Sequence, residues 1–459
     1  MSASTARPLS PDYPIPDHPR AFRICTEGVP LEGHFTTPAS EIPARNMYDN
    51  HPAVNANHAS VEAKFVKEEA KSFHIHLPRF LIYFLPGLIL APLQWAIRKG
   101  KGRICVDCTN GPDIEGSANT SIPKPSADNA DECPPVFYQH SLARHIRRLW
   151  RTRITHPTEE ILQHCDDIEA AFRRVLYHPD LAVAFAYVFG DYLIIPVGQV
   201  FGSRSAPSFF SLLADLRAAI ANSHDLLSNY PIPSLAESAV LPSIPTDLPS
   251  QIIPAVATET ESANFSNSTF VDDNGKLALR SNMRDALQQS LLSTFLIFGM
   301  PGNDRRGVCL QDDKWDPVIS HTMLYLGFII NSRAMTVSWP LYKRQELFDE
   351  LQALLLLPRS RRHLTPKQVA SILGKLRSAI QISPWGVFLS FSLAATLKNA
   401  GRNAFSSTRS WWSKGKIRLN STAQRDIRLL METLLAPDED PLWSRPIALL
   451  VPRLPLFHL

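Results

Sequence analysis

Apolar and polar positions alternate along the chain in a way that predicts a mixed α+β domain between residues 61 and 220. Apolar runs in this part are separated by basic and turn-forming residues, as expected where strands and helices are interleaved. We expect a strand that runs into a helix over residues 161–176 and a second helix over residues 208–220. The whole chain of 459 residues, 44% of them hydrophobic, is long enough to bury more than one core.

The second half of the chain continues this pattern with longer helical segments. A pair of strands is expected around residues 325–339. Thr365-Pro366 begins one of the helices, because proline is favoured at the first helical position. The expected helices cover residues 283–298, 342–357 and 366–380.

Two stretches lack any such pattern. Residues 1–60 are polar and rich in Pro, His and Asn, which predicts a flexible N-terminal arm. Residues 223–268 carry six prolines among Ser, Thr and Ala, a composition typical of loops and linkers. An unstructured segment of this length argues against a compact domain. We nevertheless expect a surface insertion, because chemistry-bearing segments stand on both sides of it.

Residues 80–97 are the one segment apolar enough to suggest a membrane span. Pro86, Gly87 and Pro92 interrupt it, whereas a spanning helix needs about 20 apolar residues. Short buried strands joined by a turn are the preferred interpretation, so no membrane association is expected. The N-terminus lacks an apolar signal region, which predicts an intracellular protein, in the nucleus or cytoplasm, that is not secreted.

The charge distribution is more informative than the net charge of +4. Arginines and lysines surround Trp150 over residues 144–153 and Trp411-Trp412 over residues 409–418. Such stretches suit a phosphate track with stacking platforms, and equally an ordinary amphipathic surface. The six cysteines show no disulfide framework. Cys105 and Cys108 form one CxxC without a second pair at zinc-ribbon spacing, so incidental cysteines are expected rather than zinc ligands.

Three pairs of consecutive aspartates are the candidate chemistry, and their surroundings differ. Asp312-Asp313 precedes a lysine and is interpreted as a solvated turn. Asp272-Asp273 follows a β-prone run and precedes Asn274-Gly275, a strong type I′ turn signal, which predicts a hairpin with two carboxylates at its tip. Asp166-Asp167 ends an expected strand. Carboxylates from two neighbouring strand ends can share two Mg²⁺ ions for in-line phosphoryl displacement.

The surrounding residues resemble the motifs of reverse transcriptases. Residues 164–172 (HCDDIEAAF) are similar to the first palm motif, and residues 201–210 (FGSRSAPSFF) to the second. Residues 270–273 (FVDD) resemble the third, with phenylalanine where tyrosine is often found. Two further resemblances complete the order along the chain: the basic fingers hairpin at residues 98–107 (RKGKGRICVD) and the primer grip at residues 325–328 (YLGF).

The resemblance covers residues 78–390 and extends into a thumb-like region. Leu364-Thr365-Pro366-Lys367, Gly374-Lys375-Leu376 and Ser383-Pro384-Trp385-Gly386 look like the thumb of retrotransposon enzymes. Among these, the reverse transcriptases of tyrosine-recombinase (DIRS-type) elements are the ones that the chain most resembles.

The resemblance implies an α+β right-hand polymerase with fingers, an antiparallel palm sheet packed on helices, and a helical thumb. The expected divisions are the N-terminal arm at 1–60, fingers and the start of the palm at 61–160, the palm with its insertion at 161–340, the thumb at 341–400 and a connection at 401–459.

The resemblance also implies the roles of the three carboxylates. Asp167 and Asp272 would be metal ligands, Asp273 the supporting third carboxylate, and the carbonyl of Ile168 would complete the metal shell. The expected cofactor is a pair of Mg²⁺ ions, with Mn²⁺ as a possible substitute. Asp166 is the alternative to Asp167; Asp167 is preferred because it places an aromatic residue five positions later.

That aromatic residue, Phe172, would be the steric gate, whose ring collides with a 2′-hydroxyl and so favours deoxyribonucleotides. Taken alone, Phe172 is an ordinary core aromatic. Other nucleotide-binding residues implied by the resemblance include a basic group that neutralises the triphosphate. The full set is Lys99, Lys101, Arg103, Phe172, Gly202, Ala206 and Pro207.

The primer–template contacts implied by the resemblance are Tyr325, Leu326, Gly327 and Phe328. The predicted activity is that of an RNA-directed DNA polymerase, and its partners are an RNA template, a DNA or RNA primer and deoxynucleoside triphosphates. The oligomeric state is left open.

Residues 443–452 (WSRPIALLVP) resemble the lead-in to an RNase H domain, and the chain ends before any aspartates of such a domain. This suggests a truncated or partly decayed element. Two alternatives stay open: a catalytically inactive remnant that only binds nucleic acid, and an RNA-dependent RNA polymerase, against which Phe172 and the fingers motif argue.

Overall fold

The computed structural model divides the chain into two compact units. Unit 1 comprises residues 1–144, 164–241 and 263–319, and unit 2 comprises residues 145–163, 242–262 and 320–459. The residues that the structure describes are 18–29, 49–98, 100–109, 117–126, 133, 136, 141–222, 234–243, 265–270, 272–299, 317–357, 363–379, 382–403 and 409–451.

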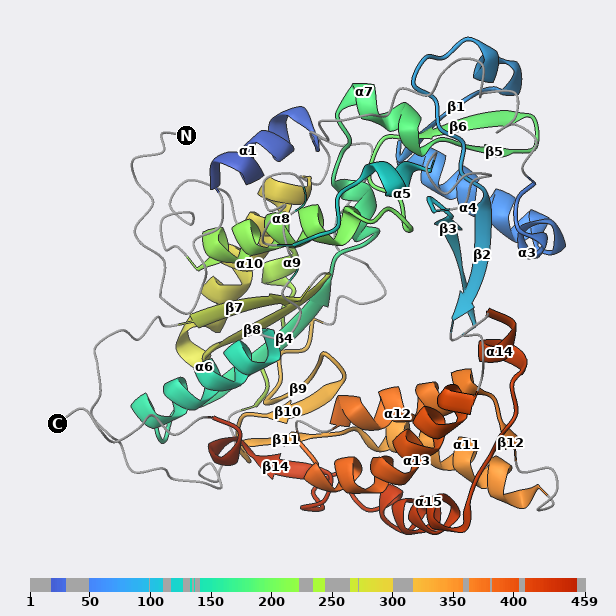
Figure 1. The fold of residues 1–459 in the computed structure, drawn as a ribbon. Helices are drawn as coiled ribbons and strands as arrows, with labels where there is room; N and C mark the ends of the chain where they lie inside the picture. Colours follow the sequence, from blue (N-terminus) through green and yellow to red (C-terminus); the bar gives the residue numbers. More distant parts are fainter. Residues whose placement is uncertain are drawn as a thin grey trace. The chain divides into compact units, whose positions relative to one another are not determined.

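The centre of unit 1 is a three-stranded sheet, whose strands lie in the order β4 (Ile161–Asp167), β8 (Asp273–Leu279) and β7 (Phe265–Phe270). Two 16-residue helices, α8 (Ala206–Ala221) and α10 (Met283–Phe298), pack against each other and against β7 and β8 (Figure 1). Both helices are buried over most of their length, so the sheet carries a helical layer on one face. This is the antiparallel sheet packed on helices that the sequence predicts.

Strands β7 and β8 form a tight hairpin. Phe270 pairs with Asp273 at the closed end of this hairpin, and Asp272 belongs to the connection between the two strands. The predicted hairpin and the carboxylates at its tip are confirmed, but the predicted turn at Asn274-Gly275 is wrong. Both residues are buried within β8, opposite Thr269 and Ser268, because the polar side chain of Asn274 has partners inside the unit.

The strand β7 also begins earlier than predicted, since residues 265–268 were expected to belong to the insertion. Asn222, which caps the end of α8, clamps the start of β7 with two hydrogen bonds. Its Nδ2 donates to the carbonyl of Asn267 (3.2 Å), and its Oδ1 accepts from the Asn267 backbone N–H (2.9 Å). The two ends of the Pro-rich segment are therefore held together. Within that segment the structure describes residues 234–243, with α9 (Ser234–Glu237).

A second, smaller sheet of unit 1 has the order β1 (His74–Pro78), β6 (Tyr192–Pro196) and β5 (Tyr187–Phe189), all antiparallel. Strands β2 (Leu93–Arg98) and β3 (Lys101–Val106), which lie between β1 and β5 in the sequence, form a separate antiparallel hairpin. Arg98 pairs with Lys101 at its closed end. The predicted basic hairpin is therefore present. The remaining elements of this region are α4 (His58–Ala70), α5 (Ala118–Ser121), α7 (Pro179–Ala182) and the 3-10 helices η2 (Arg79–Tyr83), η4 (Ala171–Arg174), η5 (Val183–Phe185) and η6 (Arg280–Asn282).

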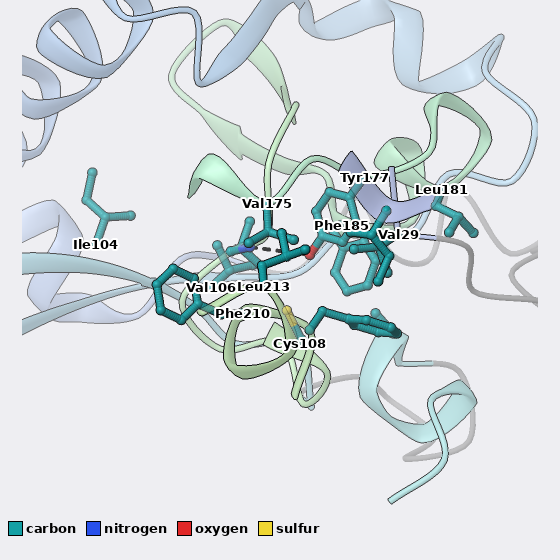
Figure 2. Close-up of a cluster of buried hydrophobic side chains, with 14 of the residues drawn as sticks. Val29, Ile104, Val106, Cys108, Val175, Tyr177, Leu181, Phe185, Phe210 and Leu213 are labelled. Atoms are coloured by element: carbon teal, nitrogen blue, oxygen red, sulfur yellow. Dashed lines mark hydrogen bonds between the residues drawn. The ribbon is translucent and has the colours of Figure 1, made fainter. Parts of the chain in front are cut away.

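One large apolar core joins these parts of unit 1. Side chains from β3, from the segment after β4 and from α8 meet in it, including Val106, Tyr177 and Phe210 (Figure 2). Residues 18–29 also contribute, although the sequence predicts a flexible arm there. They form α1 (His18–Glu27), whose Ala21 and Ile24 are buried in this core, and α3 (Pro52–Ala56) follows. The polar composition around these few apolar positions concealed them.

Unit 2 combines a four-stranded antiparallel sheet with a group of helices. The sheet has the order β14 (Ser444–Pro446), β11 (Thr336–Ser338), β10 (Phe328–Asn331) and β9 (Thr322–Tyr325). The helices predicted over 342–357 and 366–380 are confirmed within one or two residues. The helices and remaining strands are α11 (Leu341–Leu356), β12 (His363–Leu364), α12 (Pro366–Ala379), α13 (Pro384–Asn403), α14 (Arg409–Lys414), β13 (Ile417–Arg418), α15 (Ser421–Leu434) and η8 (Ile447–Leu449).

Helix α6 (Ser141–Thr155) and strand β4 contribute residues to both units. Among the residues that the structure describes, no helix is long and apolar enough to cross a membrane. The segment 80–97 that raised this question contains η2, a turn at Gly87 with φ +69° and strand β2.

Candidate active site

The end of β4 places its two aspartates on opposite faces of the sheet, because successive side chains of a strand alternate. Asp166 points toward Asn274 and Lys276 of the neighbouring strand β8. Its Oδ1 accepts a hydrogen bond from Asn274 Nδ2 (3.0 Å), and its Oδ2 forms a buried ion pair with Lys276 Nζ. Both oxygens of Asp166 are thus engaged. Asp167 lies on the other face, and this difference favours Asp167 over Asp166 as a ligand of anything bound there.

The hairpin loop brings the second pair of aspartates to the same corner. The backbone N–H of Ile168 donates to the carbonyl of Asp272 (3.1 Å), which ties the residue after Asp167 to the loop between β7 and β8. Asp272 stands in the loop and Asp273 is the first residue of β8. We call Asp167, Asp272 and Asp273 the carboxylate corner. Residues 105 positions apart in the sequence therefore meet, as the resemblance implies.

The carboxylate corner is electrostatically crowded. Burial raises the pKa of Asp272, although the backbone and the nearby Arg103 partly offset this effect. Burial, together with the negative charges of Asp272 and Asp166, raises the pKa of Asp273 to about 6. Carboxylates that disfavour their own ionisation in this way would be stabilised by a cation placed among them.

The donor set is suited to a hard divalent cation. Carboxylate and carbonyl oxygens are the ligands that Mg²⁺ prefers, and Mg²⁺ commonly completes its shell with water and substrate phosphates. Within the described part of the chain, no three His, Cys, Asp or Glu side chains form a ready-made metal site. The carboxylate corner and the nearby backbone of Ile168 offer oxygen donors of the kind that Mg²⁺ prefers.

The β2–β3 hairpin contributes the positive charge. Arg103 is exposed and lies close enough to Asp272 to lower its pKa, while Lys101 is exposed on the same face of β3. Lys99 lies outside the described residues. The thiols of this region are not arranged for zinc: Cys108 is buried and burial raises its pKa, whereas metal-binding thiols ionise readily.

The turn before α8 is fastened to the end of β3. The Val106 backbone N–H donates to the Phe201 carbonyl (2.8 Å), and Asn119 Nδ2 donates to the carbonyl of Gly202 (2.9 Å). Gly202 has φ +131°, and a Cβ added to it would lie 1.9 Å from the Val106 carbonyl oxygen. Glycine is required at this position. The role of Asn119 was not predicted, since no motif of the sequence includes it.

Ala206 and Pro207 form the first turn of α8, where proline is accommodated because its missing N–H would be unpaired anyway. Ala206 is fully buried and Pro207 is partly exposed. The helix begins two residues before the predicted start. Pro207 is therefore the member of this pair that a ligand can reach.

Phe172 lies in η4 and is partly exposed. Its ring packs against Phe201 (centroids 5.9 Å apart) and Phe210 (5.8 Å). Ala170, just before, has φ +52°, a left-handed conformation that is uncommon for a residue with a Cβ. The chain thus turns sharply after Asp167, and the ring of Phe172 is held by two aromatic neighbours.

Charged residues fix the segment that follows Asp167. The two carboxylate oxygens of Glu169 accept hydrogen bonds from Lys71 Nζ (2.5 and 2.6 Å), and Arg174 forms an ion pair with the same carboxylate. Arg173 forms an ion pair with Glu68 (3.3 Å). Lys71 and Glu68 lie at the end of α4. This anchoring was not predicted, because the partners are about 100 residues apart in the sequence.

In unit 2, the predicted primer-grip residues form the hairpin between β9 and β10. Tyr325 pairs with Phe328, and Leu326 and Gly327 make a two-residue turn with φ +50° and +82°. The side chains of Tyr325 and Phe328 are buried, so only the turn is open to a ligand. Lys343 of α11 donates to the Gly327 carbonyl (3.0 Å) and steadies the turn.

The basic stretch around Trp150 is not wholly a surface. Arg153 is completely buried and donates to the carbonyls of His156, Pro157, Glu159 and Ser332 (2.8–3.3 Å). The phosphate-track interpretation is therefore wrong for Arg153. Arg147 and Arg151 are exposed on the other side of α6.

Solved structures have a similar fold. A foamy viral protease–reverse transcriptase in complex with an RNA/DNA hybrid matches 85% of this chain and 38% of that chain, with 16% sequence identity and a TM-score of 0.50. Foamy viral protease–reverse transcriptase structures with double-stranded DNA match 94% and 88% of this chain at 15% identity, with TM-scores of 0.47 and 0.46. This chain spans 62% and 61% of the lengths of those two chains.

No protein-family profile matches the sequence, and no curated protein matches it either. At 15–16% identity the structural likeness concerns the fold alone. The chain has a mixed α+β fold that resembles the polymerase fold of reverse transcriptases.

Proposed function

We propose that the chain is an RNA-directed DNA polymerase, with Asp167, Asp272 and Asp273 at its active site. One observation carries the proposal: the hydrogen bond from Ile168 N–H to the Asp272 carbonyl joins the ends of the two motifs that bear these carboxylates. Arg103 acts on the same corner from the β2–β3 hairpin. Three carboxylates opposed by a guanidinium suit the transfer of a nucleotide from a triphosphate.

In this proposal two Mg²⁺ ions, when bound, supply Lewis-acid stabilisation of the attacking and leaving oxygens. Asp167 and Asp272 would hold these ions, and Asp273 and the Ile168 carbonyl would support them. The primer 3′-hydroxyl loses its proton to solvent, and its oxygen attacks the α-phosphorus of a deoxynucleoside triphosphate. The bond from that phosphorus to the α–β bridging oxygen breaks, and pyrophosphate leaves. Arg103 and Lys101 neutralise the triphosphate. The ring of Phe172 occupies the space that a 2′-hydroxyl would need.

We further propose that the natural template is RNA, that the primer is DNA or RNA, and that the protein belongs to a retrotransposon of the DIRS type. The last point rests on the sequence motifs quoted above. A catalytically inactive remnant that only binds nucleic acid is the second candidate, and an RNA-dependent RNA polymerase is the third. The partly exposed Phe172, held by Phe201 and Phe210, favours synthesis of DNA over RNA.

Primer extension on an RNA template with Mg²⁺ tests the proposal. The wild-type protein should incorporate deoxynucleotides, and Asp272→Asn should abolish incorporation while leaving duplex binding unchanged. Asp312→Asn, in another aspartate pair, is the matched control and should extend primers normally. Duplex binding without extension by the wild type would establish the remnant, and a preference for ribonucleotides would establish the RNA polymerase.

A further inference from the structure

A chain of buried polar side chains lies directly behind the carboxylate corner. Asp166 of β4, Asn274 and Lys276 of β8, and Arg217 of α8 are all at most 3% exposed, and Thr269 of β7 joins them. We call these five residues the buried polar network. They occupy the layer between the central sheet and the helices, where apolar side chains would be expected.

The network links all three strands of the sheet. Asn274 Nδ2 donates to Asp166 across β8 and β4 (3.0 Å), and Thr269 Oγ1 donates to Asn274 Oδ1 (2.8 Å) across β7 and β8. Thr269 and Asn274 are paired opposite each other, one step behind the pair that closes the hairpin loop. Asp166 is likewise the residue immediately before Asp167. Each link is therefore one position away from a member of the carboxylate corner.

The helices hold the other end of the network. Arg217 Nη2 donates to Thr269 Oγ1 (2.6 Å), and its Nη1 donates to Ser290 Oγ (3.1 Å) on α10. Lys276 Nζ completes the shell of Asp166 as its ion-pair partner. Directional side-chain hydrogen bonds thus fix the positions of β4, β7 and β8 relative to helices α8 and α10.

Stability alone does not account for such an arrangement. The free energy needed to take an aspartate, a lysine and an arginine out of water offsets much of their electrostatic attraction. Well-packed apolar residues of similar volume often stabilise a fold equally or better. Directional hydrogen bonds instead restrict how the groups that make them are oriented. Residues that orient metal ligands in this way typically alter metal affinity or activity by about 10–100-fold when they are replaced.

We propose that the buried polar network positions the carboxylate corner, and that Asp166 and Lys276 are its positioning residues. The network fixes the separation of Asp167 from Asp272 and Asp273, so that all three can share divalent cations. This inference rests on the proposed function, because it supposes that the corner binds metal. It also explains why Asp166, next to Asp167 in sequence, is not itself a ligand: both of its oxygens are already engaged.

The test compares variants that remove the network with one that keeps its hydrogen bonds. Asp166→Leu combined with Lys276→Met removes both charges and both links. Asp166→Asn combined with Lys276→Gln removes the charges but keeps polar partners. Thr269→Val cuts the Thr269–Asn274 link and leaves the ion pair intact. Arg153→Met, at a buried arginine of unit 2, is the control for a loss of stability elsewhere.

Mn²⁺ alone, titrated into each protein and followed by the electron paramagnetic resonance signal of free Mn²⁺, measures metal affinity without any reaction. We expect the Leu/Met double variant to remain folded, to bind a primer–template duplex within twofold of wild type, and to bind Mn²⁺ about 10–100-fold more weakly. Its Mg²⁺ requirement for primer extension should rise by a similar factor. The Asn/Gln variant should lie nearer to wild type, and Arg153→Met should lower the melting temperature without changing Mn²⁺ affinity.

Wild-type Mn²⁺ affinity in the Leu/Met variant would overturn the inference, as would a loss of affinity that follows the melting temperature across all variants, Arg153→Met included. If the Leu/Met variant does not fold, Thr269→Val decides, since wild-type affinity there would overturn the inference. If the wild-type protein extends primers and every variant has the same Mn²⁺ affinity as the wild type, the positioning role of the buried polar network is refuted and the proposed function is not. A wild-type protein that neither binds Mn²⁺ nor extends primers refutes the proposed function as well.

Discussion

The contact between Gly202 and Val106 allows a stability change to be worked out from geometry. A Cβ on residue 202 would lie 1.9 Å from the Val106 carbonyl oxygen and 3.0 Å from its carbon. Since non-bonded heavy atoms settle at about 3.5 Å, the two backbones would have to separate by more than about 1 Å. Residue 202 would also keep φ near +131°, a conformation that L side chains rarely adopt.

These two effects add. Overpacking of this kind costs about 1–3 kcal/mol, and a strained backbone conformation costs about 1–3 kcal/mol more. Gly202→Ala should therefore lower the free energy of unfolding by about 2–6 kcal/mol. For a unit of this size, a loss of 3 kcal/mol corresponds to a fall in Tm of about 5 °C.

Two other glycines separate the contributions. Gly190 has φ +58° and nothing within 4 Å of an added Cβ, so Gly190→Ala should show the conformational cost alone, about 1 kcal/mol. Gly374 is exposed in the interior of α12 with open space around it, and Gly374→Ala should stabilise by about 0.5–1 kcal/mol.

Chemical denaturation and thermal melting of the three variants provide the assay, and nucleotide kinetics provide a second readout. Gly202→Ala should raise the KM for deoxynucleotide about tenfold with unchanged duplex binding, because Arg103 is carried by the strand that ends at Val106. The reasoning is refuted if Gly202→Ala is no less stable than Gly190→Ala, or if Gly374→Ala is the most damaging of the three.

Three further predictions concern single side chains. Phe172→Val should raise the incorporation of ribonucleotides relative to deoxynucleotides by about 10–100-fold in primer extension, and an unchanged ratio would contradict the gate. Burial raises the pKa of Asp215 to about 6 despite Arg144 and Arg217 nearby, so the folded state holds this proton more tightly than the unfolded chain does. The free energy of unfolding therefore falls as pH rises from about 4 to 6. Asp215→Asn should increase the free energy of unfolding by about 1–3 kcal/mol at about pH 7.5, seen as a higher Tm, but should have no such effect at about pH 4. Arg153→Met leaves four backbone carbonyls without their donor and should cost about 2–4 kcal/mol in urea unfolding, whereas an unchanged midpoint would show that water replaces the guanidinium.

Local patterns of the sequence were sufficient where the structure is decided locally. Residues 283–298 form a helix with the predicted bounds, because its apolar positions recur at helical spacing over 16 residues. The hairpin at Asp272 was also predictable from its β-prone flanks. Its turn was not, since Asn274-Gly275 is a strong turn signal in isolation. The hydrogen bonds that Asn274 makes inside the sheet outweighed that local preference.

The candidate site was predictable only as far as motifs reach. Asp167 and Asp272 were identified by resemblance, but Lys276 was not, because its partner Asp166 is 110 positions away. From the sequence, Arg217 would be interpreted as an exposed helix residue. The structure shows it buried, with three hydroxyl partners. Long-range polar contacts of this kind leave no periodic signal, and a single sequence therefore cannot reveal them.

The clamp between Asn222 and Asn267 has a practical consequence for protein engineering. Because two hydrogen bonds bring the end of α8 and the start of β7 together, the length of chain between them is uncoupled from the geometry of both elements. Doubling a closed loop costs only about 0.6 kcal/mol in chain entropy. We therefore expect that an inserted tag or a change of chain length between Asn222 and Asn267 leaves the β7–β8 hairpin unchanged.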